Sequence, residues 1–441
     1  MKKLMFYLLA MIFISASCAK DQFFDSQEIL KDNASPFNLI SPKIKIAVIS
    51  DIHYLDPTLM PDDYVNNAAF QSKMAYDRKL IELGDPIFRK VVSDLFFERP
   101  DILLVTGDLS FEGELASHET VKGFLQKLEK EGIKVYIVPG NNDIDNPNAL
   151  SYKGDSPFSV PNITSDQFAE LYEDFGYKEA LYRDEGNSLS YICQPCSGLW
   201  ILGIEANEFI GKSVTIKPET ISWIQEKMKE ACEKDITVLA MLHYGIFEHY
   251  SGQNIPEPLL LNYEEIAGTL MDTGIRLIFT GHYHANDIVE FTNDGKTLTD
   301  IQTGSLVTPL SPYRIMILDD NFIKIDTRRV CSVNADLPEG MDFLTYSDVT
   351  ITNRLNNLFY YFLRGPIFNI PKADAKILAP FVTNAYKAYL AGDEKLYPGE
   401  RYNIRTINTL TSVPYPNVVD LLYSLWTDLP PKDNKAHIKL K

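Results

Sequence analysis

The segment IKIAVISDIH, residues 44–53, is an apolar run that ends in an aspartate and a histidine. A short continuous apolar run of this kind is typical of a strand buried on both faces of a sheet. Two further segments, ILLVTGD at 102–108 and IKVYIVPGN at 133–141, follow the same plan. The stretches between them, 86–98 and 115–130, have apolar residues at helical spacing. This alternation predicts an α/β fold in which helices cover a largely parallel sheet.

The second half of the chain continues this alternation but has more strand-like segments. Helices are predicted near 219–233 and 263–272, and two of the strands end at His243 and at Gly281-His282. The pattern predicts two sheets packed together with helices on the outside. The predicted strands are Leu189–Cys193, Leu199–Ile204, Thr237–Leu242, Ile275–Phe279, 287–291, 297–303, 313–318 and 322–327.

After about residue 340 the pattern becomes helical. Helices are predicted at 351–363, 371–391 and 416–427, with proline-rich joints between them. We therefore predict a main α/β domain over 43–334 and a mainly helical C-terminal appendage over 335–441. The aromatic residues of the appendage are interpreted as core, and a lid over a ligand is the alternative. They are Tyr360, Tyr361, Phe362, Tyr386, Tyr389 and Trp426.

The N-terminus has the features of an export signal. Two lysines precede the apolar run Leu4–Ile14, which is too short to span a bilayer comfortably. Small residues then lead to Cys18, as in a bacterial lipoprotein signal, and an ordinary secretory signal is the alternative. We predict a signal peptide over 1–18 and a tether over 19–42. The expected location is the bacterial cell envelope, with a lipid anchor on Cys18 holding the chain to the membrane.

Composition narrows the class of partner. The 441 residues carry 60 acidic and 42 basic side chains, a formal net charge of −18. Such a chain repels polyanions at long range, so no nucleic-acid partner is expected, and no protein partner is predicted. Five cysteines are too few for a disulfide scaffold. Cys193 and Cys196 form a C-x-x-C that is interpreted as a small disulfide or as two free thiols.

Polar side chains follow five of the predicted strands at the point where each strand ends. In α/β sheets the carboxyl ends of parallel strands meet at one edge, so these residues are expected to converge. Carboxylates with imidazoles suit Mn, Fe or Zn, and seven ligands exceed what one ion takes. Two divalent ions that share a carboxylate fit better. The candidate ligands are Asp51, His53, Asp108, Asn141, His243, His282 and His284.

The ordered set DIH at 51–53, GD at 107–108, GNND at 140–143, His243 and GHYH at 281–284 resembles the calcineurin-like metallophosphoesterase family. The resemblance spans residues 44–284. It implies a four-layer αββα sandwich and hydrolysis of a phosphate ester by a metal-bound hydroxide.

The resemblance also assigns the ligands to two metal ions. One ion would be held by Asp51, His53 and His284. The other would be held by Asn141, His243 and His282. Asp108 would bridge the two ions.

One position departs from the family pattern. The family usually has a histidine where this chain has Asn142, and that histidine is thought to protonate the leaving oxygen. Asparagine donates hydrogen bonds but delivers no proton near pH 7, which predicts weak activity on poor leaving groups. Asp143, which orients the family histidine, would then lose that role. His249 is a candidate to line the same pocket, with a surface position as the alternative, and His118 is a weaker candidate.

These residues predict a two-metal enzyme that hydrolyses a small phosphodiester or a nucleotide-like phosphate ester. Two dications would reverse the local charge, so an acidic chain can still bind a small anionic substrate. Asn142 keeps a second hypothesis open, a metal-loaded protein that binds a phosphate compound with little or no turnover. A third is a surface lipoprotein in which the metals only stabilise the fold.

Overall fold

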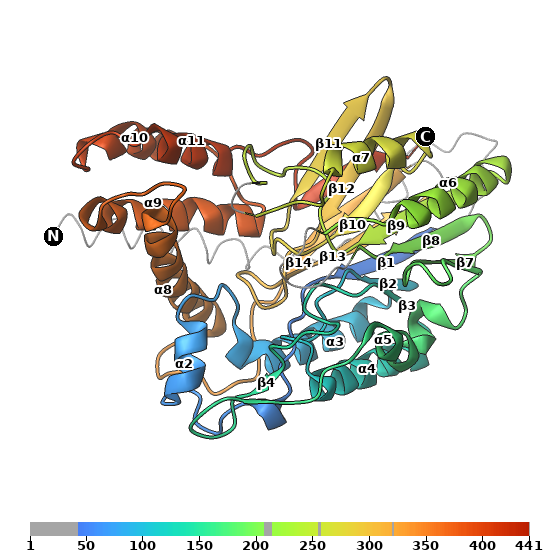
Figure 1. Cartoon of the computed structure of the whole chain (residues 1–441), viewed down its shortest axis with the longest axis horizontal. Helices are drawn as coiled ribbons and strands as arrows, with labels where there is room; N and C mark the ends of the chain where they lie inside the picture. The colour runs from blue at the N-terminus through green and yellow to red at the C-terminus, as the bar shows by residue number, and fades with distance from the viewer. Residues whose placement is uncertain (1–42, 207–213, 255–256, 320–321, 441) are drawn as a thin grey trace. The chain divides into compact units, whose positions relative to one another are not determined.

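Two mixed β-sheets lie at the centre of the computed structural model, which describes residues 43–206, 214–254, 257–319 and 322–440 (Figure 1). The first sheet has the spatial order β15 (Lys435–Lys439), β14 (Phe322–Arg329), β13 (Pro312–Leu318), β1 (Ile44–Ile49), β2 (Ile102–Val105) and β3 (Lys134–Ile137). The second has the order β11 (Ile288–Asn293), β12 (Lys296–Gln302), β10 (Leu277–Thr280), β9 (Thr237–Leu242), β8 (Leu199–Ile204), β7 (Tyr191–Cys196) and β6 (Tyr182–Arg183). A small hairpin pairs β4 (Leu150–Ser151) with β5 (Phe158–Ser159).

Parallel strands form one half of the first sheet and the middle of the second. In the first sheet β1, β2 and β3 run parallel, and β13 adds to β1 in the opposite direction. In the second sheet β8, β9, β10 and β12 run parallel, while β7 and β11 are antiparallel to their neighbours. The strands that precede the candidate ligands are therefore the parallel ones, whose carboxyl ends meet at the same edge.

Helices cover the outer faces of the two sheets. Figure 1 shows α3 and α4 on one side of the strands and α6 and α7 on the other. The α-helices are α2 (Ala68–Met74), α3 (Gly84–Glu98), α4 (Leu115–Lys130), α5 (Ser165–Leu171), α6 (Pro218–Glu233), α7 (Tyr263–Asp272), α8 (Phe343–Arg364), α9 (Lys372–Ala391), α10 (Pro398–Thr406) and α11 (Pro416–Leu425).

The strand β8 shows how the four layers pack. Its six residues are all buried. Leu199 and Ile201 belong to the core that the two sheets share. Trp200 and Leu202 point the other way and belong to a second core beneath α6 and α7. Because alternate residues of a strand face opposite sides of a sheet, this division places a layer on each face of β8. The predicted four-layer αββα sandwich is confirmed.

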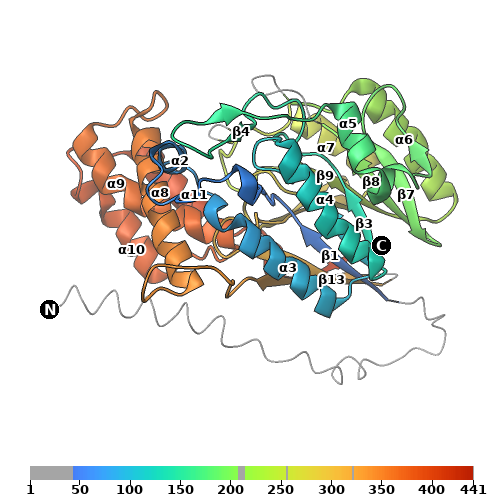
Figure 2. The same ribbon diagram turned by 90° about the horizontal axis from the view of Figure 1, so that it is seen from below.

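The C-terminal segment is mainly helical, as predicted, but it ends in a strand. Helix α9 packs against α8 and α11, α10 packs against α11, and α8 lies beside α2 (Figure 1 and Figure 2). The chain then returns, and β15 pairs antiparallel with β14. The sequence analysis did not predict β15, because Ile438 is its one buried residue and gives no periodic pattern. Residues 43–441 group as one compact unit, and the predicted border at 334 stays a prediction.

Several predictions concern residues outside the described ones. The signal peptide over 1–18, the lipid anchor on Cys18 and the tether over 19–42 all lie there. Within the described segments, every helix is too short or too polar to cross a bilayer. Cys193 is buried, Cys196 is exposed, and both are free thiols.

Candidate metal centre

All seven candidate ligands lie at the carboxyl edge of the parallel strands, and they come together. Asp51 and His53 follow β1, and Asp108 follows β2. Several of these residues have positive φ angles, including 48° at Asp51 and 51° at Asp108, because the chain turns sharply as it leaves each strand. Such strained backbone is concentrated at functional sites.

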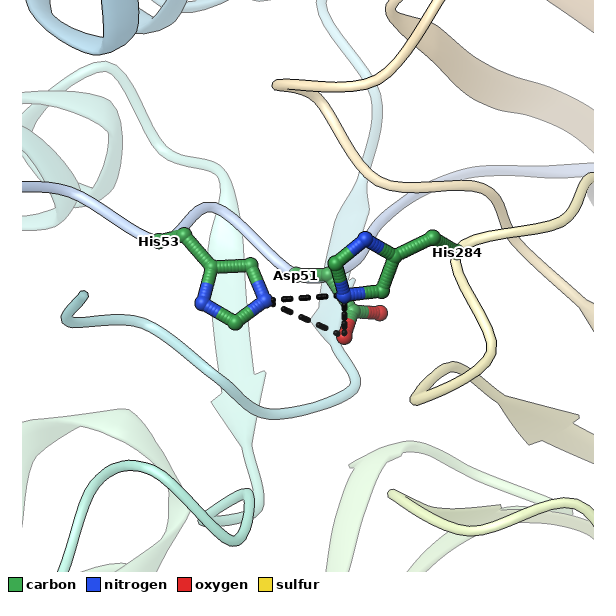
Figure 3. A group of neighbouring side chains, drawn as sticks. All are labelled: Asp51, His53 and His284. Carbon is green, nitrogen blue, oxygen red and sulfur yellow. Dashed lines mark hydrogen bonds and ion pairs between the residues drawn. The ribbon is translucent and has the colours of Figure 1, made fainter. Parts of the chain in front are cut away.

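Asp51, His53 and His284 form one group (Figure 3). The Nε2 atoms of His53 and His284 lie 3.0 Å apart. Asp51 Oδ1 lies 3.8 Å from the first of these nitrogens and 3.6 Å from the second. All three side chains are buried, with at most 3% of the residue exposed. Two imidazoles and one carboxylate therefore aim three ligand atoms at one point.

Asn141, His243 and His282 form the other group. Asn141 Oδ1 lies 2.8 Å from His282 Nδ1 and 3.1 Å from His243 Nε2, and these two nitrogens are 3.3 Å apart. His243 Nδ1 lies 2.8 Å from the backbone oxygen of Thr106, which fixes the ring and leaves Nε2 as the ligand atom. One amide oxygen and two imidazole nitrogens thus face a second point.

Asp108 lies between the two groups. Its Oδ2 is 3.5 Å from His53 Nε2 and also 3.5 Å from His243 Nε2. Burial opposes the charge of this carboxylate, but the charge of His243 and hydrogen bonds hold the pKa of Asp108 well below its usual range. A carboxylate that stays ionised and faces both groups equally fits a bridging ligand.

Close packing of the backbone brings the ligand loops together at two glycines. A Cβ atom at Gly140 would overlap the backbone and carboxylate of Asp108. A Cβ atom at Gly281 would overlap Ser50 and the carboxylate of Asp51. The GN and GH pairs of the motifs therefore use glycine because no other residue leaves room for the neighbouring ligand.

The donor set fits divalent cations. Burial, followed by the charge of Lys79, lowers the pKa of His53 well below its usual value, and burial with Arg78 does the same for His284. Both rings are therefore neutral at pH 7, with facing nitrogens that repel unless a proton or a metal ion lies between them. Neutral imidazoles with carboxylate and amide oxygens are ligands of Mn, Fe and Zn. The role of the seven residues as metal ligands stays a prediction.

Asn142 and Asp143 hold the loop beside the centre. Asn142 donates twice to Asp108, from its backbone nitrogen at 2.8 Å and from Nδ2 at 2.6 Å. Asp143 accepts from the backbone nitrogens of Ser110 and Gly140, and burial together with Asp108 raises the pKa of Asp143 to about 7. Asp143 therefore still orders the ligand loops, although there is no histidine at position 142 for it to orient. His118 likewise contacts this loop in a structural role, since its Nε2 lies 3.0 Å from the backbone oxygen of Asp143.

The prediction that His249 lines the same pocket is wrong, and so is the surface alternative. The residue is 1% exposed, and its ring lies 3.5 Å from an oxygen of Asp287 and 3.3 Å from one of Asp300. Burial opposes the charge, but these two acids raise the pKa of His249 to about 10. The side chain turns toward the buried acids, because leaving a buried carboxylate unpaired would cost more free energy than exposing the histidine would gain.

A cavity of about 370 Å³ opens onto the metal centre, and the sequence analysis missed part of its wall. Besides candidate ligands and Asn142, its lining consists of Leu358 of α8 and of Lys73, Tyr76, Asp77, Arg78 and Lys79. The Nζ of Lys79 lies 5.0 Å from the ring centre of Phe111. Lys73 lies in the last turn of α2, and Arg78 and Lys79 belong to the irregular stretch that follows it. No sequence signal distinguished them from surface lysines.

The C-terminal helices hold this basic stretch in place. Arg354 of α8 donates to the backbone oxygen of Lys79 at 2.6 Å and pairs with Glu82 at 3.1 Å. Arg78 pairs with Glu257 at 2.6 Å and also donates to the hydroxyl of Tyr386 on α9. Tyr386 belongs to the buried core, as interpreted from the sequence, and its hydroxyl also helps to position a cavity residue.

A sandwich of two mixed sheets, with buried carboxylates and imidazoles gathered where the parallel strands end, defines the class of metal-dependent phosphoesterases. A family model described as calcineurin-like phosphoesterase matches residues 44–286, more than half of the chain. The chain belongs to this family. It is a phosphoesterase of the hydrolase class, as the sequence predicted.

Individual relatives are distant. A 63-residue segment is 36% identical to a probable cyclic nucleotide phosphodiesterase of Vesicomyosocius okutanii subsp. Calyptogena okutanii (strain HA). The segment is 14% of this chain and 25% of that relative, so the match covers a quarter of the relative's length. A dimetal phosphatase from Danio rerio is similar at 11% identity and a TM-score of 0.44, over 65% of this chain and 96% of that one. A purple acid phosphatase from yellow lupin (Lupinus luteus) seeds is similar at 13% identity and a TM-score of 0.41, over 67% of this chain and 53% of that one.

Loss of one imidazole is expected to remove metal. The His243→Ala variant should bind about one ion per chain fewer than the native protein after loading with Mn²⁺, since a ligand from one group is lost. The control is His437→Ala, because His437 is exposed on β15. The metal content is measured by inorganic mass spectrometry. Equal metal content in His243→Ala and in the native chain would contradict this assignment.

Proposed function

We propose that this phosphoesterase uses two divalent metal ions to hydrolyse a small phosphodiester or a nucleotide-like phosphate ester. The observation that carries the proposal is the position of Asp108, whose Oδ2 is equally distant from the imidazoles of both ligand groups. Asp51, His53 and His284 would hold one ion, and Asn141, His243 and His282 the other. When bound, two such ions activate a water molecule and neutralise charge on phosphoryl oxygens.

The residues of the cavity suit the phosphoryl group of a substrate. Lys73, Arg78 and Lys79 line the cavity, and each of them also pairs with an acid, Glu112, Glu257 and Asp77 respectively. Their donor groups remain available to a phosphoryl oxygen, because an ammonium or guanidinium carries more than one N–H. Asn142 lies on the same cavity and has a second amide hydrogen beyond the one it donates to Asp108. The cavity volume of about 370 Å³ is at the small end of the range for ligand sites, which favours a small ester over a polymer.

The nature of the leaving group follows from Asn142. Among the described residues that line the cavity, the histidines are candidate metal ligands and the three basic residues are lysines or arginine. No histidine that lines the cavity is therefore left to protonate a leaving oxygen near pH 7. A substrate whose leaving group departs without a proton therefore suits the site better than an alkyl ester.

The test is hydrolysis of an activated aryl phosphodiester and of the matching monoester by protein loaded with Mn²⁺. Turnover of the diester that disappears on chelation and returns with Mn²⁺ is the expected result. The ratio of the two rates then defines the substrate class. Absence of turnover from protein with two bound ions would contradict the proposal.

A second candidate function is binding of a phosphate compound with little turnover. Its support is the same Asn142, whose side chain contacts Asp108 and so occupies the place of a proton donor. Tight binding of inorganic phosphate or of a phosphate ester to metal-loaded protein, without hydrolysis of the activated diester, distinguishes this function from the first.

Lys79 is expected to contribute to substrate binding. The Lys79→Gln variant should raise KM for the aryl diester about tenfold with little change in kcat, because a hydrogen bond to a charged phosphoryl oxygen contributes about 1.5 kcal/mol. Lys90→Gln is the matched control, since Lys90 lies on α3 and pairs with Asp94. An unchanged KM in Lys79→Gln would show that this lysine does not contact the substrate.

A further inference from the structure

Three carboxylates meet at a second buried place, away from the cavity at the metal centre. Asp287, Glu394 and Asp433 each bring one oxygen within 4.8 Å of the oxygens of the other two. They are 1%, 6% and 2% exposed. We refer to these three residues as the acidic cluster. None of them lines the cavity at the metal centre.

The acidic cluster joins three segments that are far apart in the sequence. Asp287 directly precedes β11, Glu394 follows α9, and Asp433 lies two residues before β15. Hydrogen bonds fasten the same segments together. Asp433 Oδ1 accepts from the backbone nitrogen of Ile288 at 2.8 Å, and Asn434 donates to the backbone oxygen of Gly392 at 2.6 Å. The geometry of the cluster is therefore set by the fold and not by one mobile side chain.

Several oxygens of the acidic cluster lack a hydrogen-bond partner among the described residues. Both carboxylate oxygens of Asp287 and the Oε2 atom of Glu394 are buried and accept no hydrogen bond among the described residues. The ring of His249 approaches Asp287 only to 3.5 Å. Buried polar atoms are nearly always satisfied, and an exception in a native fold indicates a missing ion or water.

The charges around the cluster do not balance either. Asp300 adds a fourth buried acid, which contacts His249 at 3.3 Å. The buried bases are His249 and Arg314, and Arg314 donates to the backbone oxygens of Asp433 and Asp287 at 2.6 and 3.4 Å. Four acids against two bases leave two negative charges. Uncompensated buried charge is strongly destabilising.

Two protons or one divalent cation could supply the missing charge. Burial, followed by the charge of Asp287, raises the pKa of Glu394 to about 10 and that of Asp433 to about 12. Without a cation these two carboxyl groups therefore favour their protonated form. Protons on Glu394 and Asp433 would neutralise these two groups and let Asp433 donate to Asp287, but no proton joins all three residues. A cation satisfies converging oxygens from all three residues at once.

We propose that Asp287, Glu394 and Asp433 bind a Ca²⁺ ion that joins the C-terminal segments to the loop behind His282 and His284. A site made of oxygen ligands selects a hard cation. Mg²⁺ keeps several of its waters, and residues at most 6% exposed leave little room for them, whereas Ca²⁺ accepts carboxylates in irregular geometry. This ion would be additional to the metal centre, and the proposal does not depend on the function proposed above.

The test compares Glu394→Gln with Asp393→Asn in full-length protein stripped of metal. Asp393 is the adjacent acid, but it is half exposed and pairs with Arg329 on the surface. Equilibrium dialysis should find one Ca²⁺ per chain more in the native protein and in Asp393→Asn than in Glu394→Gln. Saturating Ca²⁺ should raise the Tm of the first two proteins by about 2–5 °C more than that of Glu394→Gln.

The order of stability without Ca²⁺ gives an independent check. Because Glu394 is protonated at neutral pH without a cation and glutamine has the same shape and no charge, the Tm of Glu394→Gln in chelator should equal or exceed that of the native chain. Asp433→Asn serves in its place if Glu394→Gln does not fold. Equal Ca²⁺ content and equal Ca²⁺-induced shifts in Tm for all variants would overturn the proposal. Infrared bands of protonated carboxyls that persist in saturating Ca²⁺ would also overturn it.

Discussion

The Asp108→Asn variant is expected to hydrolyse an activated aryl phosphodiester at least about 10³-fold more slowly than the native chain, since loss of even one electrostatic stabiliser costs about 10²–10³. Asp108 Oδ2 faces an imidazole of each ligand group at 3.5 Å. The amide keeps the shape of the carboxylate and removes its charge, so the two halves of the centre lose the anion they share. The readout is kcat for Mn²⁺-loaded protein.

Asp272→Asn is the matched control for this experiment. Asp272 ends α7, its side chain is 72% exposed, and it pairs with Lys296 far from the ligand loops. Both variants should have the same far-ultraviolet circular dichroism as the native chain. If Asp108→Asn retained its metal and turned over within about tenfold of the native rate, neither a bridging role nor the two-metal reaction could stand.

The second large effect is a gain of activity. Asn142→His is expected to accelerate hydrolysis of an unactivated alkyl phosphodiester about 10²-fold, because it supplies a general acid beside the leaving oxygen. The acceleration should nearly vanish for an aryl diester, whose leaving group needs no proton. The backbone nitrogen at position 142 would keep its 2.8 Å hydrogen bond to Asp108, while the 2.6 Å bond from Asn142 Nδ2 would be lost.

The dependence of rate on leaving-group pKa separates this effect from a simple change of shape. Asn142→Ala is the comparison, because it loses the same side-chain hydrogen bond and gains no acid. A shallower dependence in Asn142→His than in Asn142→Ala is expected. Parallel dependences in the two variants would mean that position 142 is not placed to protonate a leaving group.

The sequence predicted two packed sheets with helices outside because its strands are buried on both faces. Runs such as Ile44–Ile49 and Ile102–Val105 are apolar throughout, and such runs occur where helices cover a sheet. The strand β15 escaped prediction for the opposite reason. Its stability comes from pairing with β14 across a long sequence separation, and one buried isoleucine leaves no local pattern.

The difference between local pattern and long-range contact also explains which residues of the candidate site could be predicted. The seven candidate ligands each follow a strand, so topology alone predicts that they converge. His249 also follows a strand, but Asp287 and Asp300, distant in sequence, draw its ring away. Lys79 reaches the cavity only because Arg354, 275 residues further along, holds its backbone. Contacts of that kind depend on tertiary packing and leave no trace in local spacing.

The contact of Arg354 with Lys79 and Glu82 also bears on how such an enzyme can diversify. The candidate metal ligands come from the carboxyl ends of the sheet strands, whereas Arg78 and Lys79 of the cavity wall belong to an irregular stretch that α8 and α9 hold. Evolution or a laboratory selection can therefore retune substrate preference through the helices while the reaction chemistry is inherited unchanged. A library aimed at new substrates is best placed in α8 and residues 73–79.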